Sequence, residues 1–207
     1  MPLPGETAYS ATNEASASRL TTFFRYFCSI PHAVVGALWG FAAYFATIIA
    51  WFALLFTGRY PQGLYDFNAG FVRFLARYQA YSLVAVSQYP PFDGGEHPEY
   101  PVVFQIGPPK ASYSRALVFF RIIPLIAVYF IGFFIAIFLY LLAVVAWFAV
   151  LFTGKLPDGV HGAMSFCLGY IMRAACYFLL LTEAFPGFAN EPADQAPTTP
   201  TTGVAGF

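Results

Sequence analysis

The side chains most able to do chemistry lie on one stripe of a helix predicted over residues 64–88. At 100° per residue, Arg73, Arg77 and Tyr81 share one narrow face of that helix. Arg and Tyr recur on the matching stripe of a second segment, over residues 160–183. Guanidinium groups bind phosphate through paired hydrogen bonds, so the pattern predicts a lipid-phosphate or anion site. Its predicted residues are Arg73, Arg77, Arg173, Tyr81 and Tyr177.

A structural interpretation of the same arginines is also open, and we favour it. In this interpretation Arg77 and Arg173 hydrogen-bond carbonyls or tyrosines and lock helices together. Arg73 is matched by Gly169 on the second segment, which argues against a symmetric pore. An arginine near the centre of a spanning helix costs about 2.5–3.5 kcal/mol. Three positions are therefore open for each of these two helices. The helix spans with its Arg facing other helices or a wet cavity, it lies in the interface, or it dips into the membrane and returns.

Other chemistry is sparsely represented. Cys28, Cys167 and Cys176 are odd in number and form no CxxC pair, which argues against a disulfide framework or zinc site. The three histidines share no helix face, so a haem or metal pair has little support. No Gly-rich phosphate loop, GxSxG or HExxH motif occurs. The sequence therefore predicts no catalytic residues, no metal, no cofactor and a protein that is not an enzyme.

The composition explains why polar groups are scarce. Of 207 residues, 59% are apolar and 10% are charged, against roughly 45–50% and about 25% in soluble domains. Ten basic and ten acidic residues cancel, so net charge points to no polyanionic partner such as nucleic acid. These values exclude a disordered chain, a coiled coil, a nucleic-acid module and an ordinary cytosolic enzyme. The composition predicts an integral membrane protein.

The chain is one unit written twice, with a constant offset of 96 residues. Residues 18–92 recur at 114–188. For example, Phe56-Thr57-Gly58-Arg59 returns as Phe152-Thr153-Gly154-Lys155. The match is too dense for chance, so the sequence predicts an internal duplication.

In each unit, the sequence predicts two apolar helices joined by a tight turn. No Asp, Glu, Lys or Arg occurs in residues 26–58 or 122–154, and either stretch exceeds the roughly 20 residues that cross a bilayer core. Pro31 and Pro124 are expected at the start of the long helix, and Thr-Gly at its end. The second helix of each pair is amphipathic and either spanning or interfacial. The predicted fold is an all-α integral membrane protein with four apolar helices in two tandem hairpins.

The segments outside the hairpins differ from them in composition. Residues 93–113 are rich in Pro, Gly and acids and predict an extended linker with one possible short strand at 101–106. Residues 189–207 have too little apolar content to pack and predict a disordered tail. The predicted organisation is a disordered tail at 1–17, membrane units at 18–92 and 114–188 around the linker at 93–113, and a disordered tail at 189–207.

The distribution of cations predicts an orientation. If all four helices span, both termini and the linker share one side of the membrane. The positive-inside rule then places that side in the cytoplasm. The cations expected there are Arg19, Arg25, Lys110, Arg115 and Arg121, with Arg59 and Lys155 on the opposite side.

Three phrases of the sequence resemble one bacterial integral-membrane family. They are Trp-Phe-Ala-Leu-Leu-Phe-Thr-Gly-Arg-Tyr-Pro-Gln-Gly-Leu at 51–64, Arg-Tyr-Gln-Ala-Tyr at 77–81 and Tyr-Pro-Pro-Phe at 89–92. The family is common in actinobacteria, is known only as a domain of unknown function, and often occurs in two copies. The resemblance covers residue 18 to about residue 188. It implies residence in the bacterial plasma membrane and a tandem architecture, and it implies no activity or catalytic residues.

Three classes of function fit these observations. We favour a non-catalytic structural or accessory component of the inner membrane that packs against other membrane proteins or itself. Its basis is the aromatic-rich surface and the small residues Ala46, Ala50 and Ala53 at helix-packing spacing. The second class is a lipid- or anion-binding or transport protein that uses Arg77 and Arg173, and the third is a membrane-embedded enzyme. The expected partners are the lipid bilayer and either other membrane subunits or a second copy, with no nucleic acid.

Overall fold

The computed structural model describes residues 2–13 and 18–188, and it is mostly helical. Each predicted unit holds a long helix followed by a shorter one, so the tandem arrangement is confirmed. The predicted tail at 189–207 lies outside the described residues. In chain order the elements are β1 (Thr7–Ala11), α1 (Arg19–Thr57), α2 (Gln62–Ser82), β2 (Val102–Ile106), α3 (Arg115–Phe119), α4 (Ile122–Thr153) and α5 (Asp158–Phe178).

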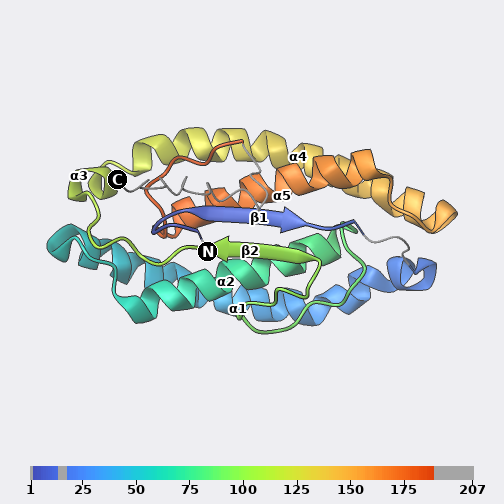
Figure 1. Cartoon of the computed structure of the whole chain (residues 1–207), viewed down its shortest axis with the longest axis horizontal. Coiled ribbons are helices and arrows are strands. Elements are labelled where there is room, and N and C mark those ends of the chain that lie inside the picture. Colours follow the sequence, from blue (N-terminus) through green and yellow to red (C-terminus); the bar gives the residue numbers. More distant parts are fainter. Residues whose placement is uncertain (1, 14–17, 189–207) are drawn as a thin grey trace, which may run out of the picture.

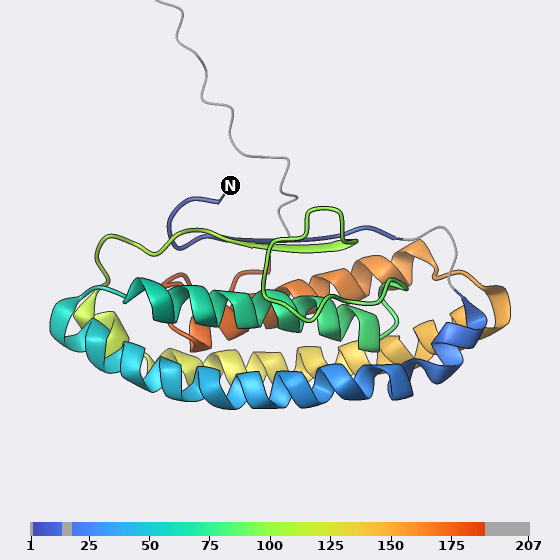
Figure 2. The ribbon, with the colours of Figure 1, turned by 90° about the horizontal axis from the view of Figure 1, so that it is seen from below.

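The helices form two layers and the strands form a third (Figure 1, Figure 2). α1 and α4 make the first layer, α2 and α5 cover them, and β1 and β2 lie over α2 and α5. α1 packs on α2, α4 packs on α5, and contacts between α2 and α5 join the two units. In Figure 2, α1 and α4 are bowed, with their convex side facing away from the other elements.

The long helices run antiparallel, so the end of each lies beside the start of the other unit. The indole Nε1 of Trp51 donates to the carbonyl of Val118 at 3.3 Å, and that of Trp147 donates to the carbonyl of Thr22 at 3.2 Å. This arrangement changes the predicted grouping of cations. Arg19 lies against Gly154 at one end of the molecule, and Arg115 lies against Gly58 at the other. The cations expected to share one side are therefore divided between the two ends.

The ends of the long helices follow local sequence signals, with one exception. The Ser18 hydroxyl accepts from the N–H of Thr21 at the start of α1. Gly58 and Gly154, at φ of 70° and 74°, end α1 and α4 in the left-handed conformation, as predicted. The prediction that Pro31 starts a helix is wrong, because α1 begins at Arg19 and runs through it. One face of the first turns is held against the rest of the protein, because Thr22, Arg25 and Ser29 are buried. These contacts offset the hydrogen bond that proline removes.

The two strands pair antiparallel, with Thr7 opposite Ile106 and Ala11 opposite Val102. β2 confirms the predicted strand at 101–106. β1 lies within residues 1–17, so the prediction of a disordered tail there is wrong for Thr7–Ala11. The strand forms because its partner is far away in the sequence, which local composition does not reveal.

Each strand packs on the second helix of the unit that it does not immediately precede. β1 precedes the first unit but contacts α5, whereas β2 precedes the second unit and contacts α2. Tyr9 of β1 is 2% exposed and lies 6.3 Å from the ring of Phe104 across the sheet. The strands therefore join the two units in addition to the contact between α2 and α5.

Two helices of the described chain, α1 and α4, are long and apolar enough to cross a membrane. Four helices in two pairs were predicted, with the second of each pair amphipathic and either spanning or interfacial. The structure shows two spanning candidates, and α2 and α5 are held between the other two layers. The small sheet also corrects the all-α prediction. Only 17% of the most apolar window of α1 and 11% of that of α4 are buried. A core helix of a soluble protein would be mostly buried.

Candidate functional site

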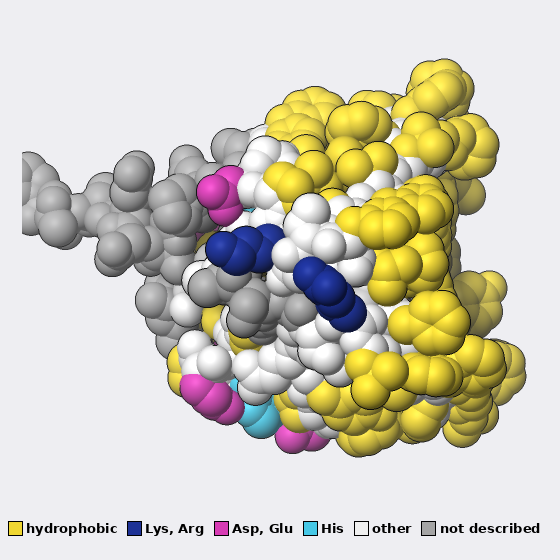
Figure 3. All heavy atoms as spheres, turned by 90° about the vertical axis from the view of Figure 1, so that its right-hand side faces the viewer, with side chains coloured by type: hydrophobic (Ala, Val, Ile, Leu, Met, Phe, Trp, Pro, Cys, Tyr) yellow, Lys and Arg dark blue, Asp and Glu magenta, His cyan; other side chains and the backbone are white. Residues whose placement is uncertain are grey.

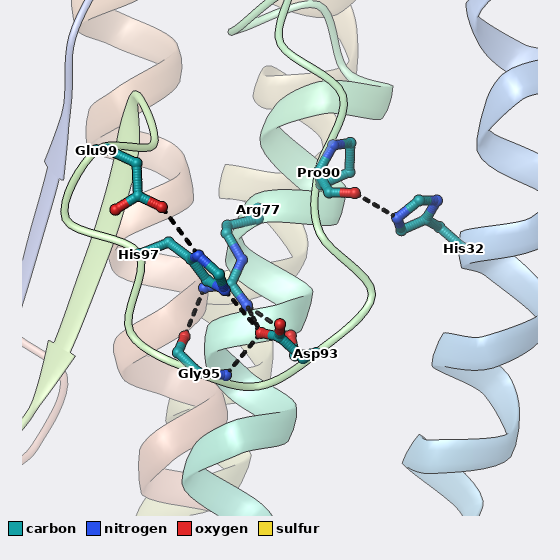
Figure 4. Close-up of polar contacts among 7 residues, drawn as sticks. All are labelled: His32, Arg77, Pro90, Asp93, Gly95, His97 and Glu99. Atoms are coloured by element: carbon teal, nitrogen blue, oxygen red, sulfur yellow. Dashed lines mark hydrogen bonds and ion pairs between the residues drawn. The ribbon is translucent and has the colours of Figure 1, made fainter.

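Arg77 and Arg173, one on each second helix, are buried and bind backbone carbonyls. The Arg77 guanidinium donates to the carbonyls of Asp93 at 2.6 Å and Gly95 at 2.8 Å (Figure 4). Arg173 donates through Nε to the carbonyl of Gly187 at 3.1 Å. Each arginine thus ties the segment that follows its helix back onto that helix. These are contacts of the kind expected from the structural interpretation of the two arginines.

Arg73 pairs with the exposed carboxylate of Glu96 at 3.1 Å. Together with Arg77, it lines a cavity of about 70 Å³ beneath the linker. Small-molecule sites usually measure about 300–1,000 Å³, so this cavity is small for a lipid headgroup. Arg173 does not line it. The structure therefore brings Arg73 and Arg77 together and leaves Arg173 outside their cavity.

Tyr81 and Tyr177 are buried beneath two other arginines. The guanidinium carbon of Arg25 lies 4.7 Å from the centre of the Tyr81 ring. Arg25 is 1% exposed, and its Nη1 donates to the carbonyls of Tyr81 at 2.8 Å and Val86 at 2.7 Å. An arginine expected on the membrane surface is thus inside the protein, at the end of α2.

The second unit repeats this arrangement at the end of α5. The guanidinium carbon of Arg121 lies 3.8 Å from the centre of the Tyr177 ring, and its Nη2 donates to the carbonyls of Tyr177 and Thr182. Every member stands 96 residues after its counterpart in the first unit. We call the two sets the arginine clasps: Arg25 with Tyr81 and Val86, and Arg121 with Tyr177 and Thr182.

Each clasp encloses a turn that would normally contain glycine. Val84 has φ of 69° and Leu180 has φ of 63°, in the left-handed region that bulky side chains rarely adopt. In the first turn, the N–H of Ala85 bonds the carbonyl of Ala80, and the N–H of Val84 bonds that of Tyr81. This is the Schellman pattern of helix ends, for which glycine is preferred. The clasp arginine adds bonds to the same turn, and its positive charge faces the negative end of the helix.

Asp93, His97 and Glu99 form a hydrogen-bonded cluster on the linker (Figure 4). His97 Nε2 lies 2.8 Å from Asp93 Oδ1, and Nδ1 lies 3.1 Å from Glu99 Oε1. Hydrogen bonds to these two carboxylates raise the pKa of His97, and the bond from His97 lowers the pKa of Asp93. Both acids are more than half exposed, so the cluster faces solvent. In the described part of the chain, no three His, Cys, Asp or Glu side chains gather as metal ligands would.

One side of the molecule is almost wholly apolar. Exposed Phe, Tyr, Leu, Ile and Val side chains extend along α1 from Leu20 to Phe56, and along α3 and α4 from Leu117 to Phe152. We call this surface the apolar face. Viewed along the molecule, hydrophobic side chains cover this side, and the visible Lys, Arg, Asp, Glu and His lie on the other (Figure 3).

The apolar face contains a pocket of about 600 Å³ between the two long helices. Gly40 and Tyr44 of α1 line one wall, and Tyr129, Gly132 and Phe133 belong to the opposite wall on α4. Side chains of α2 and α5 close the inner end. The lining is apolar apart from tyrosine hydroxyls and backbone, so the pocket has no group suited to acid, base or nucleophilic chemistry.

Comparison with protein families gives one match, to the family described as Domain of unknown function (DUF4389). It covers residues 19–93 and again 115–190. The chain belongs to this family. The two DUF4389 copies confirm the resemblance predicted from the sequence. Comparisons with curated proteins and with solved structures give no match.

The arginine clasp is common to both DUF4389 copies, and sequence reasoning missed it. Arg25 and Arg121 looked like flanking surface cations, yet they occupy equal positions in the two copies inside aromatic runs, which was the available signal. Other features belong to one DUF4389 copy alone. His32 is buried, lies 2.9 Å from the carbonyl of Pro90 and stacks on Phe92, whereas the second copy has Val128 there.

Proposed function

We propose that the protein is a non-catalytic component of the bacterial inner membrane that lies lengthwise in one leaflet. The apolar face contacts lipid chains, while the sheet and the linker face the aqueous side. Its role is structural or accessory, as a platform for other membrane proteins or for a second copy. The observation that carries this proposal is the position of the exposed linker charges at the middle of the long helices.

The position of those charges follows from close contacts. Trp39, near the middle of α1, packs against Gly70 of α2, and Gly70 touches Gly94 of the linker. The linker carboxylates of Asp93 and Glu99 are 61% and 69% exposed. If the long helices crossed the bilayer, these acids would lie near its centre. Placing a charged side chain there costs about 2.5–3.5 kcal/mol. With the helices parallel to the membrane plane, the acids remain in water.

The length of the apolar face supports the same orientation. From Leu20 to Phe56 the exposed apolar side chains of α1 extend over about 54 Å at 1.5 Å per residue. To fit a hydrocarbon core of about 30 Å, the helix would have to tilt by roughly 55°, beyond the usual range of about 0–40°. A single layer of helices about 10 Å thick fits within one leaflet.

The cations at the two ends of the molecule support the cytoplasmic leaflet. Arg19 and Lys155 are exposed at one end, and Arg59 and Arg115 are exposed at the other. A lengthwise crossing would place two cations on each side of the membrane. Lying in the plane puts all four on one side, where they meet anionic headgroups, in keeping with the positive-inside rule.

Cysteine labelling tests the orientation. Three single variants, Arg59→Cys, Pro98→Cys and Lys155→Cys, are made in a background in which the exposed Cys28 is serine. A membrane-impermeant maleimide is then applied to intact spheroplasts and to inverted vesicles, with the Cys28→Ser parent as the control for the buried Cys167 and Cys176.

The labelling pattern separates three arrangements. We expect all three sites to react only in inverted vesicles. Opposite reactivity of residues 59 and 155 would show that the molecule crosses the bilayer lengthwise. Reactivity of residue 98 opposite to both would show four spans in two hairpins. Either of these results would overturn the proposed orientation.

A further inference from the structure

We propose that the pocket in the apolar face binds one acyl chain of a membrane phospholipid. The proposal rests on the function proposed above, because the pocket opens on the surface assigned to the bilayer. At about 600 Å³, its volume is within the range of about 300–1,000 Å³ for small-molecule sites. The pocket lies between the two repeats, since α1 and α2 of the first and α4 and α5 of the second all line it.

The shape and chemistry of the pocket specify the occupant. The rim side chains Tyr44, Tyr129 and Phe133 are 52%, 62% and 61% exposed on the apolar face, so the mouth opens where lipid chains would lie. The inner end is formed by side chains such as Phe71 of α2 and Ile171 of α5. No charged side chain lines the pocket, so it cannot hold a headgroup. Water fills apolar cavities poorly, whereas a flexible hydrocarbon chain suits this lining.

Small residues keep the pocket open. Gly132 is in the wall on α4, and a Cβ placed there would meet only the Tyr170 ring, at 3.9 Å. Ala136 is one turn further along the same wall. Larger residues at both positions would occupy the space assigned to the chain. Leucine favours helix much more than glycine does and only slightly less than alanine does, so Gly132→Leu and Ala136→Leu should leave α4 intact.

The test uses the full-length protein in mild detergent and the fluorescence of Trp39. The Trp39 ring lies 6.1 Å from that of Phe71, a pocket residue. The chain has three tryptophans, so Trp51→Phe and Trp147→Phe leave Trp39 as the single reporter. Phosphatidylcholine with mid-chain dibrominated acyl groups is the quencher, and dibromostearic acid is tested separately. Native mass spectrometry counts the bound lipids.

Saturable quenching with one phospholipid bound per chain is the expected result. The Gly132→Leu/Ala136→Leu variant should weaken this binding by about tenfold or more, because the filled pocket excludes the chain. The matched control is Ala42→Leu, at an exposed α1 position that does not line the pocket, and it should bind like the parent.

Several results would overturn the proposal. They are quenching that does not saturate, equal binding by the filled variant and the control, or binding of the free fatty acid but not of the phospholipid. A stable dimer that binds no lipid would assign the apolar face to a second copy. Failure of this test leaves the labelling result unaffected, so the pocket and the membrane orientation are judged independently.

Discussion

Replacing Arg25 with methionine tests whether the arginine clasps hold the fold together. The variant keeps most of the apolar stem and removes a guanidinium that is 1% exposed. It leaves the carbonyls of Tyr81 and Val86 without that donor inside the protein. Hydrogen bonds from charged donors contribute about 1.5–3 kcal/mol each, so two give roughly 3–6 kcal/mol. After subtracting the recovered cost of burying the cation, we expect the free energy of unfolding to fall by about 3 kcal/mol.

Denaturant unfolding in detergent micelles, followed by tryptophan fluorescence, measures this loss. Arg121→Met should behave like Arg25→Met, because it removes the matching contacts at the end of α5. Arg115→Met is the control at an exposed site and should change stability by less than about 0.5 kcal/mol. Hydrogen exchange should also quicken at the amides of Val84 and Ala85, within the clasped turn. A loss below about 1 kcal/mol for Arg25→Met, or no change in that exchange, would refute the reasoning.

Three further predictions concern the linker and the sheet. The pKa of His97 is raised in the folded protein, so the stabilisation that His97 gives is complete below the unfolded pKa of about 6.5 and is lost as pH rises through the folded pKa. The difference in the free energy of unfolding between the parent and His97→Gln should therefore shrink over that pH range. A difference that grows with pH would contradict this sign. Gly94→Ala should destabilise by about 1–3 kcal/mol in denaturant unfolding, since its Cβ would lie 2.6 Å from the Cα of Gly70, whereas Gly63→Ala, with open space around it, should not. Deleting residues 2–12 should speed hydrogen exchange in α5 more than in α2, because β1 packs on α5. Faster hydrogen exchange in α2 alone would argue against the packing of β1 on α5.

The parts of the fold that local pattern encodes were predictable. Apolar runs without charge predict α1 and α4, because their length is enough to cross a bilayer core. Thr-Gly predicts their ends, because a left-handed cap depends only on the residues next to it. The strand at 101–106 was also visible, between Pro- and Gly-rich segments. Predictions failed where the partner was distant. β1 needs β2 to form, and Pro31 is accepted inside α1 because one face of the preceding turns, with Arg25, is buried against distant segments.

The candidate site was predictable only in part. Arg77 and Arg173 were recognised from their shared position on the second helix, and Tyr81 and Tyr177 from the same stripe. The stripe could not identify the binding partners of these side chains. A position on a helix shows which way a side chain points, but not which group of the protein it meets. In the structure the arginines bind carbonyls of the following segments, while the tyrosines lie beneath Arg25 and Arg121.

By itself, the sequence determined that the chain is apolar, duplicated and built from paired helices. These properties depend on composition and on a constant offset, which need no knowledge of packing. The tertiary structure decided that α1 and α4 run antiparallel, that each strand crosses to the other unit, and that Arg25 and Arg121 are buried. It also gathered the exposed apolar side chains on one face with a pocket between the repeats. Those features depend on which surfaces of distant segments meet, because burial and pairing are properties of contacts and not of residues taken singly.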